Sequence, residues 1–280
     1  MKFEHTEVMN FEGAFRGLRN PMNSWAKSDS EFGISEIYGE ENTEALYAWL
    51  EKIFPTYNPF DPEQDEPNDY QAELDKTDEW LWENGILNKD SKDDCVTYAF
   101  IGPVDMNLAQ RMIAAGSPND KFLRQIFVSV DITAPEYWWS QFDTYKVGTV
   151  ANSTSKMHKL ASTPITRDCF EMDDYATLKV FDREPYNFDE TTEDCWDEII
   201  EICETLRKRY NETKDIKYWK ELIRILPESW LQTRTVTMNY ANLRGMYYWR
   251  KDHKLTEWHT FCDWVKTLPY AEDLILYKNE

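Results

Sequence analysis

The sequence has no long apolar run, few cysteines and few histidines. No segment approaches the roughly 18 apolar residues of a membrane span, and the opening MKFEHTEVMNFEG lacks the apolar stretch of a secretory signal. The five Cys form no CxxC pair, and the four His lack the spacing of metal ligands. We therefore expect a soluble cytoplasmic protein with reduced thiols, no metal and no membrane partner.

Basic residues and glycines are also scarce. Lys and Arg number 31 against 52 Asp and Glu, which gives a formal net charge of -21. Phosphate backbones repel such a chain, and no concentrated basic patch offsets the repulsion, so we expect no nucleic-acid partner. The nine glycines form neither a Rossmann fingerprint nor a phosphate-loop lysine motif.

What is present is enough apolar material for a folded protein. The chain is 41% hydrophobic and 15% aromatic, so we expect one α+β domain over 1–280 that is helix-rich with a central antiparallel or mixed sheet. An acidic insertion is expected at about 55–95, since 61–95 holds thirteen acidic and three basic residues. It is either a plain solvated face or an acidic arm that occupies a basic partner.

The middle of the chain shows clear periodicity. Apolar residues recur at helical spacing from Asp105, and Gly116 ends that helix. The alternation in QIFVSVDIT predicts a half-buried strand over 125–133, with Ile126, Val128, Val130 and Ile132 on the buried side. Pro135 then opens a helix that we expect to run through EYWWSQFDTYK.

The second half reads mainly as helices. We expect an amphipathic helix over 196–210, another that Pro227 ends, and a last one that begins near Trp258. Residues 231–250 mix apolar and polar side chains without strong breakers, which places Asn239 within a helix. There, Asn239 either binds a ligand or satisfies nearby backbone groups.

The segment TYKVGTVANSTSK, residues 144–156, concentrates hydroxyls and lysines in an acidic chain. Hydroxyl groups and ammonium groups are what a phosphate monoester needs, although a polar surface loop has the same composition. Arg250 is either a buried anchor or a charge at a helix end. His158, which has no identified partner, is either a general base or structural.

Taken in order, these segments resemble the flavin-dependent thymidylate synthases over about two thirds of the chain. In that family a Leu-Pro pair precedes a Thr-rich stretch, Asn-Ala-Arg-Ser-Leu, and an Arg eleven residues after the Asn. The segment ILPESWLQTRTVTMNYANLRGMYYWR is similar, and its matching positions are Leu226, Pro227, Thr237, Asn239, Leu243 and Arg250.

A second match covers the family's signature, in which a glycine-ended helix and a strand precede Gln-x-x-Arg-His-Arg and then Ser, Ser and Arg. Gly116, the strand and Gln141 follow that order. Beyond them the pattern departs: Thr144, Tyr145 and Lys146 replace Arg-His-Arg, and Thr149, Thr154 and Lys156 replace Ser, Ser and Arg. A third, weaker similarity is FEGAFRGLRNPMNSW, which resembles the family's early arginine-bearing helix.

The resemblance implies a homotetramer that binds deoxyuridylate, uses FAD, reduced folate and NADPH, and transfers a one-carbon unit to the pyrimidine. By position, it implies that the pyrimidine nucleotide contacts Gln141, Thr154, Lys156 and Arg250. The flavin contacts carried over in the same way are Arg124, Thr144, Lys146 and Asn239. The catalytic residues stay unassigned, because in this family the reduced flavin carries the chemistry.

The losses fall mostly on the flavin side. Lysine keeps the phosphate charge and threonine keeps the hydroxyl, whereas the first Arg and the His of the triplet are gone. Three hypotheses therefore stay open. The chain is a diverged methyltransferase, a non-catalytic protein that binds or sequesters nucleotides, or an acidic interaction protein on the same fold.

Overall fold

The chain divides into two compact units, which a computed structural model describes over residues 1–36, 87–89, 95–172, 178–183 and 188–278. Unit 1 comprises residues 1–6 and 129–238, and unit 2 comprises 7–128 and 239–280. Most of the predicted acidic insertion lies outside the described residues. Within the described ranges, no helix is long and apolar enough to cross a membrane.

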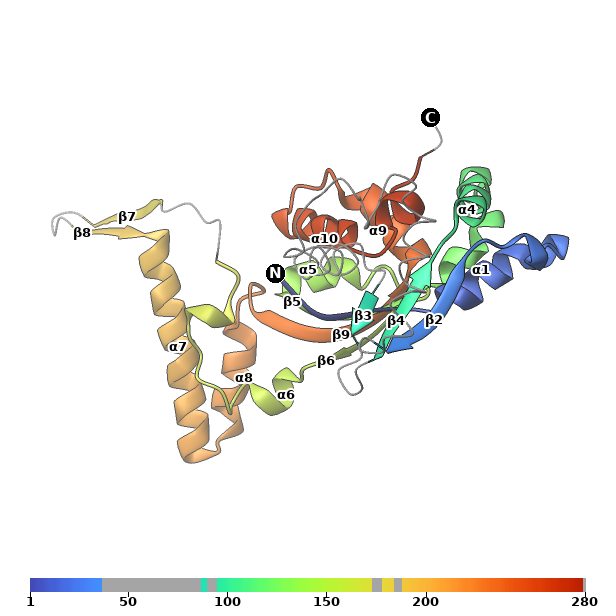
Figure 1. The fold of residues 1–280 in the computed structure, drawn as a ribbon. Helices are drawn as coiled ribbons and strands as arrows, with labels where there is room; N and C mark the ends of the chain where they lie inside the picture. Colours follow the sequence, from blue (N-terminus) through green and yellow to red (C-terminus); the bar gives the residue numbers. More distant parts are fainter. Residues whose placement is uncertain (37–86, 90–94, 173–177, 184–187, 279–280) are drawn as a thin grey trace, which may run out of the picture. The chain divides into compact units, whose positions relative to one another are not determined.

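Figure 1 labels most of the helices and strands of each unit. Those mainly in unit 1 are β1 (Lys2–Met9), β5 (Phe127–Pro135), α5 (Glu136–Phe142), β6 (Val150–Ser153), α6 (Lys156–Lys159), η4 (Arg167–Cys169), β7 (Lys179–Arg183), β8 (Phe188–Thr191), α7 (Thr192–Thr213), α8 (Ile216–Ile225) and β9 (Leu231–Asn239). Those of unit 2 are α1 (Phe11–Arg19), η1 (Asn20–Met22), η2 (Trp25–Lys27), β2 (Glu31–Glu36), β3 (Leu87–Lys89), β4 (Cys95–Phe100), α4 (Pro103–Ala115), η3 (Asn119–Gln125), α9 (Tyr240–Arg250), α10 (Thr256–Lys266) and η5 (Ala271–Ile275).

Helices and antiparallel strands are mixed, which confirms the predicted α+β class. The largest sheet has the strand order β1-β5-β9-β6. Its strand β5 alternates as predicted: Val128, Val130 and Ile132 are fully buried, while the residues between them are half-buried. Strand β5 begins two residues later than the predicted segment and ends at Pro135.

Helix α5 follows Pro135, as predicted, and buries three aromatic side chains: Trp138, Trp139 and Phe142. It ends at Phe142, four residues before the predicted end. At this end the Thr144 hydroxyl donates to the Gln141 carbonyl at 2.7 Å. A threonine that bonds local backbone in this way competes with continued helix, which accounts for the early stop.

The prediction of a helix around Asn239 was wrong, because strand β9 runs from Leu231 to Asn239 and only then does α9 begin. The β-branched residues in TRTVT favour a strand over a helix. Asn239 is the N-cap of α9: its side chain accepts from the Asn242 backbone N–H, and the Asn242 side chain accepts in return. The residue that ends the strand therefore also starts the helix.

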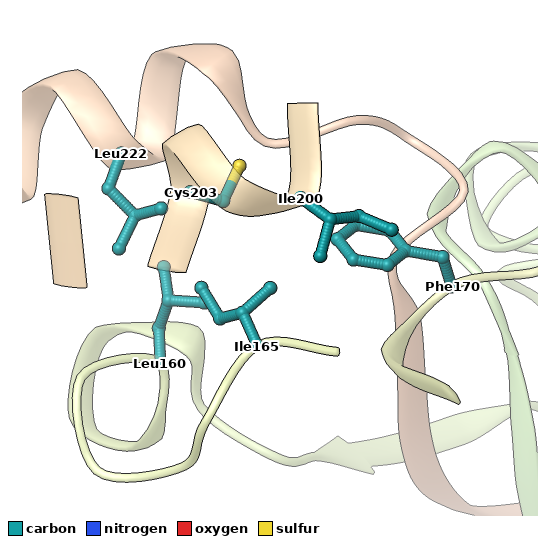
Figure 2. Packing of buried hydrophobic residues seen from close by; sticks show 6 residues of the cluster. All are labelled: Leu160, Ile165, Phe170, Ile200, Cys203 and Leu222. Carbon is teal, nitrogen blue, oxygen red and sulfur yellow. The ribbon is translucent and has the colours of Figure 1, made fainter. Parts of the chain in front are cut away.

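Helices α7 and α8 lie side by side in unit 1, with the β7–β8 hairpin at the start of α7 (Figure 1). Helix α7 contains the predicted 196–210 segment and is longer at both ends. Figure 2 shows how its apolar face packs on the segment before it, where Ile200 lies beside Phe170. The residues drawn in this cluster are Leu160, Ile165, Phe170, Ile200, Cys203 and Leu222.

An ion pair within α7 supports this packing. Glu204 accepts from the Arg207 guanidinium through both carboxylate oxygens, at 2.7 Å each, and from the Ile165 backbone N–H at 2.9 Å. These bonds lower the pKa of Glu204 from its ordinary 4.5 to about 2, with Arg207 the largest cause. Arg207 also donates to the Ala161 carbonyl, so the pair ties α7 to the 161–165 segment.

Glu204→Gln should lower the free energy of unfolding at pH 7 by about 1–2 kcal/mol, because it removes a charge-assisted pair. The carboxylate's contribution is complete above the unfolded pKa and is lost as the pH falls toward the folded one. The difference between wild type and variant should therefore shrink as the pH falls below 4.5. Urea unfolding at several pH values measures this; Glu201→Gln, exposed on the same helix, should show no such difference.

Unit 2 has an aromatic core around Phe11. The rings of Tyr240 and Tyr270 lie edge-on to it, at 5.8 and 5.7 Å between centroids. The Tyr240 hydroxyl donates to the Pro269 carbonyl and the Tyr270 hydroxyl donates to the Ala99 carbonyl. Burial raises the pKa of Tyr240, and it raises the pKa of Tyr270 to about 12. Both phenols therefore stay protonated as donors.

A buried carboxylate joins α1 to α4 in the same unit. Asp105, fully buried, accepts from Arg19 Nε at 2.5 Å and from the hydroxyls of Ser28 and Ser30 at 2.5 and 2.6 Å. Asp29 accepts from the Val104 and Asp105 backbone N–H groups, which satisfies the first turn of α4. The loop between α1 and β2 is thereby fixed to α4.

Asp105→Asn should lower the free energy of unfolding by about 3–5 kcal/mol, because it leaves the buried Arg19 guanidinium without a counter-charge. The matched control is Asp263→Asn, which removes an exposed pair with Lys266 and should cost about 0.5 kcal/mol or less. Denaturant unfolding followed by tryptophan fluorescence measures both. Equal losses in the two variants would contradict the role given to Asp105.

Candidate functional site

Thr154 and Lys156, two of the predicted nucleotide contacts, lie directly after strand β6. That strand pairs antiparallel with β9, and Ser153 is opposite Arg234. The pairing extends one residue further, because the Thr154 N–H donates to the Thr233 carbonyl at 2.9 Å. Thr154 is exposed, so its backbone is held by β9 while its side chain faces solvent.

Lys156 is half-buried and its ammonium group forms an ion pair with Glu136 at the start of α5. The side chains of the two residues are 31% and 23% exposed, so the pair is accessible to a solute. A phosphate group that reached this ammonium group would exchange with the Glu136 carboxylate as its partner.

Gln141, the third predicted contact in unit 1, is half-buried near the end of α5. It follows Glu136 by five residues, which places its side chain about 140° around the helix from that of Glu136. Thr154 and Lys156 are two residues apart in sequence, and Gln141 projects from a different side of α5 than the Glu136 partner of Lys156. The fourth predicted contact, Arg250, belongs to unit 2, where its guanidinium lies 4.6 Å from the ring centroid of Trp258.

Two residues that the sequence did not single out, Gln232 and Arg234, lie beside Thr154. The Gln232 amide donates to the Thr154 carbonyl at 2.9 Å and accepts from Arg234 Nε at 2.9 Å. Arg234 also donates to Asp143 at 2.8 Å and stacks on Trp139, with Cζ 4.2 Å from the ring centroid. Because Gln232 and Arg234 are two residues apart in strand β9, their side chains lie on one face of it.

Of the four residues implied to contact a flavin, two bond nearby backbone groups. The Thr144 hydroxyl donates to the Gln141 carbonyl, and the Asn239 side chain caps α9. The two cations, Lys146 and Arg124, are exposed and belong to unit 1 and unit 2 respectively. A flavin dinucleotide needs several donors for its diphosphate. In this set the Thr144 donor is engaged by the Gln141 carbonyl, whereas Asn239 caps α9 through its oxygen.

A cavity of about 450 Å³ lies elsewhere in unit 1, and none of the eight predicted contact residues lines it. One of its cations, Arg167, donates to Asp197 at 2.7 and 2.8 Å and to Glu193 at 3.0 Å. The two others are also paired: Lys2 lies 2.7 Å from Glu4, and the Met1 ammonium group lies 3.2 Å from Glu171. The full lining is Met1, Lys2, Thr133, Arg167, Asp168, Phe170, Glu171, Met172 and Leu231.

The buried thiols are not nucleophiles at neutral pH. Burial raises the pKa of Cys203 and of Cys262 to about 11, so both are protonated. Cys203 packs in the α7 cluster of Figure 2. The part of the chain that the structure describes contains no group of three or more His, Cys, Asp or Glu residues that could hold a metal ion.

No family model and no curated protein matches the sequence. Among solved structures, the chain is similar to flavin-dependent thymidylate synthase ThyX from Helicobacter pylori complexed with FAD and dUMP. The identity is 16% and the TM-score 0.43, over 76% of this chain and 95% of that one. It is also similar to the UMP/dUMP methylase PolB from Streptomyces cacaoi bound with 5-Br UMP, at 14% identity and a TM-score of 0.44, over 62% and 83%.

The resemblance predicted from the motifs, to the flavin-dependent thymidylate synthases, is thus found again among solved structures. At TM-scores below 0.5 the likeness assigns no ligand to this chain. The binding residues are therefore argued from their own contacts.

The purified protein should be colourless and should not bind added FAD, because Thr144 and Tyr145 stand where the family has an Arg and a His, and the Thr144 hydroxyl bonds the Gln141 carbonyl. Titration of the protein into FAD, followed by flavin fluorescence and visible absorption, measures this. Free FAD in the same buffer is the reference. A yellow preparation, or saturable quenching at micromolar protein, would show that the chain holds a flavin through other residues.

Proposed function

We propose that the protein binds a pyrimidine nucleoside monophosphate and recognises its phosphate through Thr154 and Lys156. The observation that carries this proposal is the accessible ammonium group of Lys156, beside a threonine whose backbone β9 holds in place. In a chain of net charge -21, an anion needs a local cation of this kind. The proposal takes the pyrimidine from the family resemblance of the sequence.

Exchange of partners at Lys156 explains how a phosphate would enter. In the free protein, Glu136 neutralises the ammonium group at the surface of unit 1. A phosphate dianion carries more charge and more acceptor oxygens than a carboxylate, so it competes well for a lysine. The neighbouring Thr154 hydroxyl supplies a neutral donor, and a lysine binds phosphate as a point charge without bidentate geometry.

Nucleotide binding without flavin chemistry is the form of the function that these residues support. Gln141 belongs to the proposal by its sequence register, as a contact to the rest of the nucleotide. Arg250, which belongs to unit 2, stays a prediction of the resemblance alone. One-carbon transfer, reduced folate and NADPH depend on a flavin, and the first Arg and the His of the family's triplet are replaced here by Thr144 and Tyr145. We therefore prefer the non-catalytic alternative to the methyltransferase.

Calorimetric titration with dUMP should show saturable binding, and Lys156→Ala should weaken it about 10–100-fold. Loss of a charge-assisted contact costs about 1.5–3 kcal/mol, which corresponds to that range. Deoxyuridine, which lacks the phosphate, should bind the wild type weakly and should not discriminate between the two proteins.

The matched control is Lys159→Ala, which removes an exposed lysine three residues further along and should leave dUMP binding unchanged. Absence of wild-type binding at millimolar dUMP would refute the proposed function. Equal losses in both lysine variants would show that the effect is one of net charge alone.

A further inference from the structure

We infer that Gln232 and Arg234 are positioning residues that fix the Thr154 peptide for phosphate binding, an inference that rests on the proposed function. Neither residue belongs to the motifs that carry the family resemblance. Their link to Thr154 is a continuous chain of hydrogen bonds within unit 1, from Asp143 through Arg234 and Gln232 to the Thr154 carbonyl.

The direction of every bond in this chain is determined by chemistry. Arg234 Nε can only donate, so it must face the carbonyl oxygen of the Gln232 amide. The amide nitrogen of Gln232 is then left to donate to the Thr154 carbonyl. Asp143 accepts from the other side of the guanidinium. If the Gln232 amide were reversed, its nitrogen would face the Arg234 Nε donor and its oxygen would face the Thr154 carbonyl acceptor.

The inner part of this series of hydrogen bonds is buried, whereas Asp143 at its outer end is 52% exposed. Gln232 is 8% exposed. Trp139, which is fully buried, lies against the Arg234 guanidinium, and its Nε1 donates to the backbone carbonyl of Gln232. A guanidinium that is stacked and bonded on two edges has little freedom left. The side chains that hold Thr154 are therefore fixed before any ligand arrives.

The consequence for the site lies in the Thr154 backbone. Its N–H donates to Thr233 and its carbonyl accepts from Gln232, so both of its polar backbone groups are tied to β9. Lys156 follows two residues later. A site prepared in this way binds its ligand without a further loss of backbone entropy.

Gln232→Glu separates positioning from folding. A glutamate at 232 still accepts from Arg234, as a charged partner, but has no donor for the Thr154 carbonyl. We expect the variant to stay folded and to bind dUMP about tenfold more weakly than wild type by calorimetry. Its affinity for deoxyuridine should not change, because the effect acts on the phosphate.

Asn152→Asp is the matched control, since it adds the same charge on an exposed position of β6 and should weaken dUMP binding less than Gln232→Glu does. Arg234→Lys is a second test. The lysine keeps the positive charge but cannot stack on Trp139 and also bond both Gln232 and Asp143, so this variant should bind dUMP several-fold more weakly. If Gln232→Glu does not fold, the lysine variant decides the outcome.

The outcomes separate the two proposals. Wild-type binding together with unchanged affinity in Gln232→Glu and Arg234→Lys would overturn the positioning role and leave the proposed function standing. Equal weakening in Asn152→Asp would attribute the effect to charge, and would also overturn it. If the wild type does not bind dUMP at all, both proposals fail.

Discussion

A buried amide in a strand needs a partner for its donor and a partner for its acceptor, and this constraint acts in unit 1 at Gln232. The residue is 8% exposed and lies between Arg234 and Thr154. An unpaired donor or acceptor there would cost about 1–3 kcal/mol. The positions of Thr154 after β6 and of Asp143 after α5 relative to β9 are therefore constrained together. The arrangement around Thr154 and Lys156 follows from that requirement.

Much of the fold could be predicted from periodicity. The alternation of apolar residues in β5 and the helical spacing in α4, α7 and α10 follow from burial of one face, which sequence records directly. Strand β9 was missed because its polar threonines hide the alternation, although its β-branched residues were visible. A helix that runs through 231–250 has Asn239 in its interior, so the sequence prediction does not identify Asn239 as the N-cap of α9.

The site was predicted less completely than the fold. Thr154 and Lys156 stand out because hydroxyls and lysines are concentrated there in an acidic chain, and their binding role stays a prediction. Glu136, Gln232 and Arg234 do not stand out, since each acts through a partner distant in sequence, such as the pair of Arg234 with Asp143. Most of the acidic insertion lies outside the described residues, so its role as an arm for a basic partner stays a hypothesis.

A crystal structure of the protein with dUMP tests the central claim most directly. The account predicts a phosphate oxygen within hydrogen-bond distance of the Lys156 ammonium group and the Thr154 hydroxyl, with Glu136 displaced from its lysine. The Thr154 carbonyl should keep its bond to Gln232. The central claim would be contradicted if the nucleotide bound elsewhere, for example in the cavity beside Arg167, while the Lys156–Glu136 pair stayed intact.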